Sequence, residues 1–204
     1  MRPKSSLPPP KKPVAAARGP SAHEIRIIGG QWRRTPIKVL DKPGLRPTPD
    51  RVRETLFNWL GQDLTGWRCV DAFAGTGALG LEAASRGAAQ VVALEQEPEL
   101  ARQLQLQAER LKASMVQVQR TDAVAAMQRL TAGAFDLVFL DPPFDGPWFE
   151  LALQAAVRLV PLGGWVYLEA PTAWTDEALA PFGMEVLRHL KAGAVHAHLL
   201  RRAA

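Results

Sequence analysis

Segments typical of strands and segments typical of helices alternate along most of this chain. Short apolar runs predict buried strands, and longer segments with apolar residues at helical spacing predict helices. The predicted order is a strand that ends at 69–70, helix 78–86, strand 90–95, helix 98–112, strand 116–119, helix 123–130, strand 135–140, helix 149–160 and strand 165–169. This alternation restricts the region to a parallel, doubly wound α/β sheet. Each crossover helix carries the chain back to the end of the sheet where the previous strand began, so the next strand runs in the same direction.

The carboxyl-terminal region follows a different pattern. Two alternating apolar segments, 184–190 and 195–200, flank a short Lys-Ala-Gly-Ala segment at 191–194. This arrangement predicts a β-hairpin, so an antiparallel strand would complete an otherwise parallel sheet. The predicted fold class is therefore α/β: a mostly parallel, Rossmann-like sheet of seven strands with an antiparallel C-terminal strand.

Composition divides the chain into three regions. Residues 1–23 are rich in Pro, Ala and Lys without an apolar period, which predicts a disordered basic tail. Residues 24–66 begin with two short alternating runs around Gly29-Gly30, which predict a small β-hairpin. Residues 67–204 are the predicted main domain, and residues 24–66 are an extension of it that faces the substrate.

A helix is predicted after the hairpin, ending near Leu60. Thr48 or Asp50 is suited to cap its start, because short polar side chains accept hydrogen bonds from the first free N–H groups. Arg51 and Arg53 lie off its apolar stripe, and we expect them in solvent.

A glycine-rich loop follows the first strand of the main domain. Its Gly75-x-Gly77-x-x-Gly80 spacing fits both nicotinamide-dinucleotide enzymes and methyltransferases, since glycines let a cofactor approach the backbone. Glu95 ends the second strand, where an acid binds ribose hydroxyls. Asp122 follows the third strand, where it is suited to accept from an adenine amino group or to cap the next helix. The candidate cofactor-binding residues are Asp71, Phe73, Gly75, Gly77, Glu95, Asp122 and Ala123.

Asp71 separates the two cofactors. This carboxylate precedes the glycines, where it would attract the amino group of a methionine moiety and repel a pyrophosphate. The glycine loop contains no Arg or Lys to offset that repulsion. The sequence therefore favours S-adenosylmethionine over NAD.

The sequence Asp141-Pro142-Pro143-Phe144 directly follows the apolar strand 135–140. Open α/β sheets bind ligands at this end of their strands. Two prolines stiffen the loop and remove two N–H donors, which leaves it rich in acceptors. Such a loop is suited to hold an amino-bearing ring, with Asp141 and the Pro142 carbonyl as acceptors and Phe144 stacked on the ring. We predict methyl transfer to the exocyclic nitrogen of a base, with Asp141, Pro142 and Phe144 as catalytic residues.

The net charge of +5 and the pI of about 9.8 favour a polyanionic partner. Basic side chains are interleaved with an aromatic one on the predicted hairpin, a pattern that suits a nucleic-acid surface and equally an ordinary solvated face. The candidate RNA-contacting residues are Arg26, Trp32, Arg33, Arg34, Arg46, Thr48 and Arg51.

Several classes of protein are disfavoured. No apolar stretch is long enough to cross a bilayer, and the amino terminus has no apolar signal region. The lone Cys69 fits a buried core position in a reducing cytoplasm. The histidines show no metal-ligand spacing, and His196 and His198 are expected on an exposed strand face, so we predict no metal.

These motifs together resemble the bacterial 16S ribosomal RNA guanine-N2 methyltransferases of the RsmD type. The resemblance runs from about residue 24 to the carboxyl end and rests on the segments 25–33, 45–48, 50–60, 73–83 and 141–144. It implies a class I methyltransferase fold, S-adenosylmethionine as donor, and a guanine in the head of the small ribosomal subunit or its assembly intermediate as substrate. We expect a monomer. The alternatives are an NAD-dependent dehydrogenase, a methyltransferase of adenine N6, and a non-enzymatic RNA-binding assembly factor.

Overall fold

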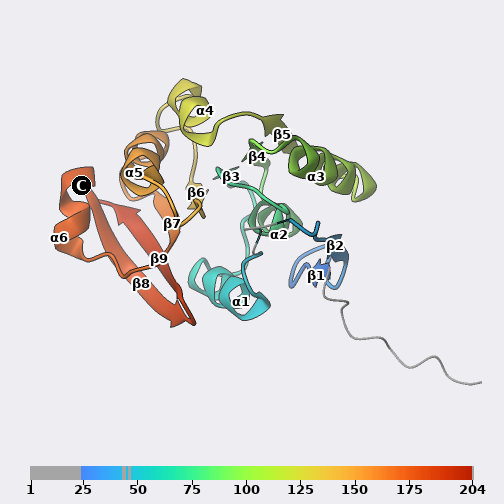
Figure 1. The fold of residues 1–204 in the computed structure, drawn as a ribbon, viewed down its shortest axis with the longest axis horizontal. Coiled ribbons are helices and arrows are strands. Elements are labelled where there is room, and N and C mark those ends of the chain that lie inside the picture. The colour runs from blue at the N-terminus through green and yellow to red at the C-terminus, as the bar shows by residue number, and fades with distance from the viewer. Residues whose placement is uncertain (1–23, 43–44, 46, 204) are drawn as a thin grey trace, which may run out of the picture.

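The computed structural model describes residues 24–203 apart from residues 43, 44 and 46, and it confirms the predicted fold class (Figure 1). The predicted tail and Arg46 lie outside the described residues. Seven strands form the main sheet in the order β5-β4-β3-β6-β7-β9-β8. They are β3 (Arg68–Asp71), β4 (Gln90–Glu95), β5 (Val116–Arg120), β6 (Leu137–Leu140), β7 (Trp165–Ala170), β8 (Met184–Ala192) and β9 (Val195–Arg202).

Strands β5, β4, β3, β6 and β7 are parallel, and β9 runs antiparallel to both β7 and β8. The chain therefore starts at the middle of the sheet with β3, winds outward to β5, and returns to β6. This reversal leaves the carboxyl ends of β3 and β6 side by side, and such a switch point is where open α/β sheets bind ligands.

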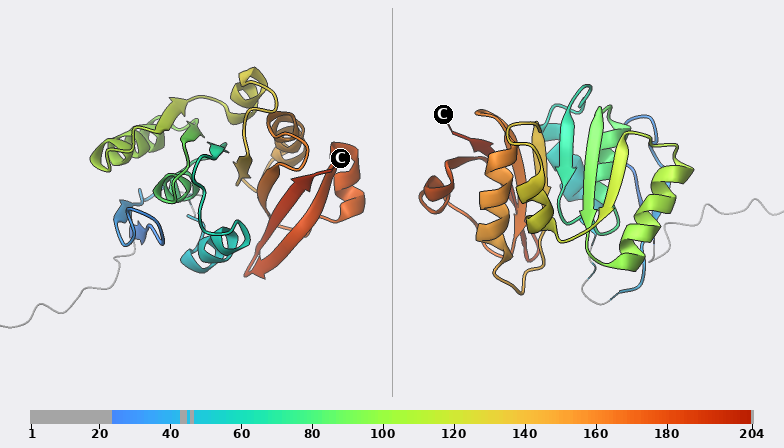
Figure 2. Two further views of the ribbon diagram at one scale, coloured as in Figure 1. Left: turned by 180° about the vertical axis from the view of Figure 1, so that it is seen from behind. Right: turned by 90° about the horizontal axis from the view of Figure 1, so that it is seen from above.

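Helices cover both faces of the sheet. Apolar residues of α1 (Asp50–Trp59), α2 (Ala78–Ser85) and α3 (Pro98–Arg110) form one core cluster with one face of the strands. The second cluster contains residues of α4 (Ala123–Arg129), α5 (Trp148–Leu159) and α6 (Asp176–Leu179) on the opposite face. In the right-hand view of Figure 2, α5 lies in front of the sheet and α1 behind it. Both faces are covered, which explains why the central strands are apolar throughout.

The predicted amino-terminal hairpin is present as β1 (Glu24–Arg26) and β2 (Pro36–Lys38), which pair antiparallel. Its long connection packs directly on α2. A Cβ atom at Gly30 would lie 1.9 Å from the Ser85 carbonyl oxygen, so only glycine allows this approach. Ile27 and Ile37 join the same core cluster as α1 and α2, so residues 24–66 share a core with the sheet.

Two predictions for this region need correction, and two short elements near the C-terminus were not predicted. Pro49, rather than Thr48 or Asp50, occupies the N-cap position of α1, with no side-chain cap bond. Arg53 is fully buried instead of solvated, because buried acceptors surround its guanidinium group. The short α6 and the 3₁₀ turn Ala180–Phe182 were not predicted; neither is long enough to show an apolar period.

His198 is buried, contrary to the predicted exposed face. Its Nε2 accepts the Trp174 N–H at 3.0 Å, and its Nδ1 lies 3.3 Å from the Leu168 carbonyl oxygen. Burial lowers the pKa of His198 to about 4, so the ring is neutral and serves as a structural bridge.

Cys69 is buried, as predicted. No helix in the described part of the chain is long and apolar enough to cross a bilayer.

Candidate active site

A cavity of about 1160 Å³ opens over the carboxyl ends of the central strands. The glycine loop forms one side, the Asp-Pro-Pro-Phe loop another, and the segment before α1 and the β8–β9 turn complete the wall. The cavity therefore brings the two predicted motifs into one site. Of the predicted catalytic and cofactor residues, it is lined by Asp71, Phe73, Gly75, Glu95, Asp122, Ala123, Asp141, Pro142 and Phe144.

Four acidic side chains end four neighbouring strands of this site, and all of them line the cavity: Glu95, Asp71, Asp141 and Glu169, on or directly after β4, β3, β6 and β7. Side chains alternate between the faces of a strand, so all four project to the face covered by α1 and α2. The row gives the cavity a strongly acidic floor. Such a floor repels a pyrophosphate and favours a ligand with cationic and hydroxyl groups.

Glu95 holds the glycine loop in place. Its Oε2 accepts the Gly75 N–H at 2.7 Å, and its Oε1 accepts the Glu97 N–H at 2.7 Å. Gly75 has φ of 53°, a left-handed conformation that favours glycine. A carboxylate has about four lone-pair positions, so Glu95, which lines the cavity, retains acceptor positions beyond these two hydrogen bonds.

Gly77 has a packing role in the glycine loop. It does not line the cavity, and it begins α2 with φ of 78°. A Cβ atom at Gly77 would lie 2.2 Å from Leu104 Cδ1, so the missing side chain allows α3 to pack against the loop. Gly77 thus shapes the site by letting α3 pack against the glycine loop.

Asp71 is buried at the base of the cavity. Its Oδ2 accepts the Gly80 N–H at 2.8 Å. Burial raises the pKa of Asp71 to about 7, the Gly80 bond opposes this shift, and the Glu95 charge adds to it. Because burial and the Glu95 charge disfavour its ionised form, a cationic ligand beside Asp71 would stabilise the carboxylate.

Asp122 both caps a helix and faces the site. Its Oδ1 accepts the Ala125 N–H at 2.8 Å, which makes it the N-cap of α4. The capping role that the sequence left open is therefore present. Asp122 and Ala123 also line the cavity, and the second carboxylate oxygen is left for a ligand.

The Asp-Pro-Pro-Phe loop follows β6. Asp141 is half-buried, Pro142 is buried and Phe144 is 39% exposed. Burial, together with the nearby Glu169 and Asp71 charges, raises the pKa of Asp141 well above its ordinary value. The Phe144 ring lies 6.2 Å from the Phe149 ring between centroids, which supports it from one side. The loop therefore places an acceptor of raised basicity beside an aromatic face.

Sequence reasoning missed Glu169 and Tyr167. Glu169 is 3% exposed, and its Oε1 accepts the Tyr167 hydroxyl at 2.8 Å. A signal was available, because Glu169 is the last residue but one of its apolar strand, close to the position that Asp71 and Glu95 take on theirs. Among the described residues, no group of three or more His, Cys, Asp or Glu side chains could hold a metal ion.

The predicted RNA-contacting residues are placed outside the cavity, with one exception. Arg26, Arg33, Arg34 and Arg51 are exposed, and Trp32 is partly buried against the core. Thr48 is the exception: it is 4% exposed and lines the cavity. The remaining candidate, Arg46, lies outside the described residues.

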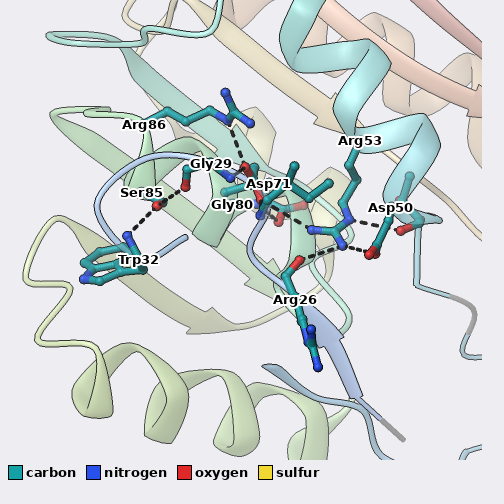
Figure 3. Close-up of polar contacts among 12 residues, drawn as sticks. Arg26, Gly29, Trp32, Asp50, Arg53, Asp71, Gly80, Ser85 and Arg86 are labelled. Carbon is teal, nitrogen blue, oxygen red and sulfur yellow. Dashed lines mark hydrogen bonds and ion pairs between the residues drawn. The ribbon is translucent and has the colours of Figure 1, made fainter. Parts of the chain in front are cut away.

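A buried ionic cluster attaches the amino-terminal extension to the wall of the site (Figure 3). Its centre is Glu82 on α2, which is fully buried and accepts the Ile28 and Gly29 N–H groups, each at 2.7 Å. Arg86 donates to Glu82 at 2.8 Å, and Arg53 donates at 3.4 Å. Arg53 also donates to the Arg26 and Thr48 carbonyl oxygens; the Arg26 bond is drawn in Figure 3. The cluster thus fixes the hairpin, α1 and the cavity-lining segment before α1 relative to one another.

The strand order, the glycine loop and the acidic row at the carboxyl edge define a class I S-adenosylmethionine-dependent methyltransferase fold. The family model described as conserved hypothetical protein 95 matches residues 25–201. The Escherichia coli K12 protein named ribosomal RNA small subunit methyltransferase D is 42% identical over 160 residues, which are 78% of this chain and 76% of the relative. The chain belongs to this family, the RsmD family of ribosomal RNA methyltransferases.

Solved structures agree with this assignment. The structure of yhhF from Escherichia coli has a TM-score of 0.77 and 38% identity, covering 89% of this chain and 99% of that one. The Thermus thermophilus 16S rRNA N2 G1207 methyltransferase RsmC, solved with AdoMet and guanosine, shares the fold with a TM-score of 0.68 at 23% identity. That match covers 89% of this chain and 50% of RsmC.

Proposed function

We propose that this protein transfers a methyl group from S-adenosylmethionine to the exocyclic N2 of a guanine in 16S ribosomal RNA of the small subunit. The observation that carries this proposal is that the Asp-Pro-Pro-Phe loop and the glycine loop line one cavity. Family membership supports the ribosomal RNA substrate. Guanine and its N2 position follow from the family membership, and the donor-rich guanine edge that Asp141 would meet supports them.

The residues divide the work between two halves of the cavity. In the cofactor half, Asp71 faces the amino group of the methionine moiety, Glu95 accepts from the ribose hydroxyls, and Asp122 with Ala123 contacts the adenine. In the other half, Asp141 and the Pro142 carbonyl accept from the target amino group, and Phe144 stacks on the base. The base must leave its stack to enter such a pocket.

The reaction needs an acceptor because the N2 lone pair is delocalised into the guanine ring. Hydrogen bonds from the N2 protons to Asp141 and the Pro142 carbonyl favour a pyramidal nitrogen with a localised pair. That pair forms the new N–C bond as the C–S bond of the sulfonium breaks, and the sulfur keeps the bonding electrons. The methylated nitrogen then loses one proton, which Asp141 accepts.

Methyl incorporation into purified small subunits that lack the modification tests this function. Mass mapping should place one methyl group on a guanine of 16S RNA, and the same RNA from a strain without this protein should lack it. Label on adenine, or none on RNA, would contradict the proposal.

Glu95→Ala should weaken S-adenosylmethionine binding by about 1.5–3 kcal/mol, since two charge-assisted hydrogen bonds to the ribose would be lost. Calorimetric titration measures the affinity. Glu109→Ala, an exposed glutamate of α3, is the matched control and should bind as the parent does. Unchanged affinity in a folded Glu95→Ala protein would remove Glu95 from the cofactor site.

We further propose that residues 24–66 form an RNA-facing extension of the methyltransferase domain. The exposed Arg33 and Arg34 lie in the connection of the hairpin, which is docked on α2. The protein would act as a monomer on an assembled or partly assembled particle.

Replacing Arg33 and Arg34 with Ala should flatten the salt dependence of RNA binding. Two lost phosphate contacts reduce the slope of log affinity against log salt by about 1.4, at about 0.7 per phosphate on single strands. Arg129 and Arg188, exposed on α4 and β8, provide the control pair. Equal slopes for the parent and the Arg33/Arg34 variant would show that this surface does not contact phosphate.

A further inference from the structure

Glu169 is a buried acid that the proposed mechanism does not use. It lines the cavity close to the end of β7 and is 3% exposed. A carboxylate in such a place is costly unless it is paired or hydrogen-bonded, because burial penalises its charge. Its hydrogen bond from the Tyr167 hydroxyl, at 2.8 Å, partly meets that cost.

The sheet register places Glu169 beside Asp141. Leu140 of β6 pairs with Leu168 of β7, so the residues that follow them, Asp141 and Glu169, are neighbours across the two strands. Neighbouring strands are about 4.8 Å apart, and matched positions project to the same face. Both side chains line the same cavity. The two carboxyl groups therefore lie on neighbouring strands and face the same cavity, close enough for the Glu169 charge to act on Asp141.

We propose that Glu169 is a positioning residue for methyl transfer, whose negative charge beside Asp141 makes the Asp141 carboxylate a stronger acceptor for the proton that leaves the methylated nitrogen. The inference rests on the proposed function, because it needs Asp141 to act as the acceptor. Glu169 itself need not touch the base. Its effect passes through the electrostatic field at Asp141, and Tyr167 fixes the orientation of its carboxylate.

The surroundings of Asp141 support this role. The titratable groups that face it are Glu169 and Tyr167 on β7 and Asp71 on β3, and Asp71 is in turn raised in pKa by burial and by Glu95. After burial, the Glu169 charge is the largest cause of the raised pKa of Asp141. Burial also raises the pKa of Glu169, and hydrogen bonds from Tyr167 and Thr48 oppose that rise and favour its charged form.

The pH dependence of methyl transfer tests the inference. Asp141 must be ionised to accept the proton, so the rate should rise with pH through its pKa. Glu169→Gln removes the neighbouring charge at equal size, which lowers the pKa of Asp141. The rising part of the pH–rate profile, its acid limb, therefore moves to lower pH. The same change weakens the base, so the plateau rate should fall about tenfold. A residue with a structural role alone would not move the limb.

Tyr167→Phe provides a second variant that touches different atoms. Loss of the hydroxyl leaves Glu169 more often neutral, so the limb should move in the same direction by a smaller amount. Glu185→Gln, an exposed glutamate on β8, is the matched control and should reproduce the parent profile.

The outcomes separate the two proposals. If the parent protein places no methyl group on guanine N2, the proposed function fails whatever the variants do. If the parent methylates guanine and both the Glu169→Gln and Tyr167→Phe profiles superimpose on it, or move to higher pH, the inference about Glu169 is overturned.

Discussion

Asp141→Asn should slow methyl transfer to guanine by about 10²–10⁴-fold, the usual range for loss of a positioned general base. Asn keeps the size of the side chain, but its NH₂ group would face a guanine donor and its amide cannot take the proton. The affinity for S-adenosylmethionine should barely change, because Asp141 belongs to the substrate half of the cavity. The variant should therefore lose turnover and keep its cofactor.

Both quantities can be measured on one preparation, with titration calorimetry for the cofactor and methyl incorporation into unmodified small subunits for the rate. Asp63→Asn, in the exposed turn after α1, makes the same chemical change away from the cavity and should match the parent. If Asp141→Asn methylates guanine at the parent rate, the carboxylate is not the acceptor and the mechanism is wrong.

Glu82→Ala should lower the free energy of unfolding by about 3–5 kcal/mol, the cost of breaking a buried ion pair by removing one partner. Glu82 is fully buried between Arg53 and Arg86, and it accepts two backbone N–H groups of the hairpin connection. Its loss leaves two buried guanidinium groups without their shared anion. It also releases the connection that holds the hairpin on α2.

Chemical denaturation monitored by tryptophan fluorescence measures this effect, and Trp32 in the same connection should report local release. Glu54→Ala on α1 is the matched control, since exposed positions usually change stability by less than about 0.5 kcal/mol. A Glu82→Ala protein as stable as the Glu54→Ala protein would show that the cluster does not attach the extension.

Much of the fold follows from local spacing in the sequence. Strand β4 has the predicted bounds, and most of the other main elements differ from prediction by one to three residues. The apolar period of a helix or strand depends only on neighbours along the chain, which is why these elements can be predicted from the sequence. The same holds for the two site motifs, because the carboxyl ends of parallel strands meet at one edge of a sheet.

The C-terminal histidines and the start of α1 show where prediction from local residue spacing fails. His198 alternates with His196 along β9, but the segment around Trp174 covers only one of them. Thr48 has the chemistry of a cap, yet it lines the cavity. For His198 a contact from a distant segment decided between the two local options, and for Thr48 the position of its segment against the cavity did.

The sequence by itself determined the parallel sheet with its antiparallel end, the glycine loop, and an acid at the end of each of several strands. Only the tertiary structure decided which charged side chains meet. Glu82 meets Arg53 across 29 residues and Ile28 across 54, and the register of β6 and β7 brings Glu169 and Asp141 to the same cavity. Such pairings depend on how crossovers and docked loops bring remote segments together. The energy of a buried charge depends on those remote neighbours, and local periodicity carries no information about them.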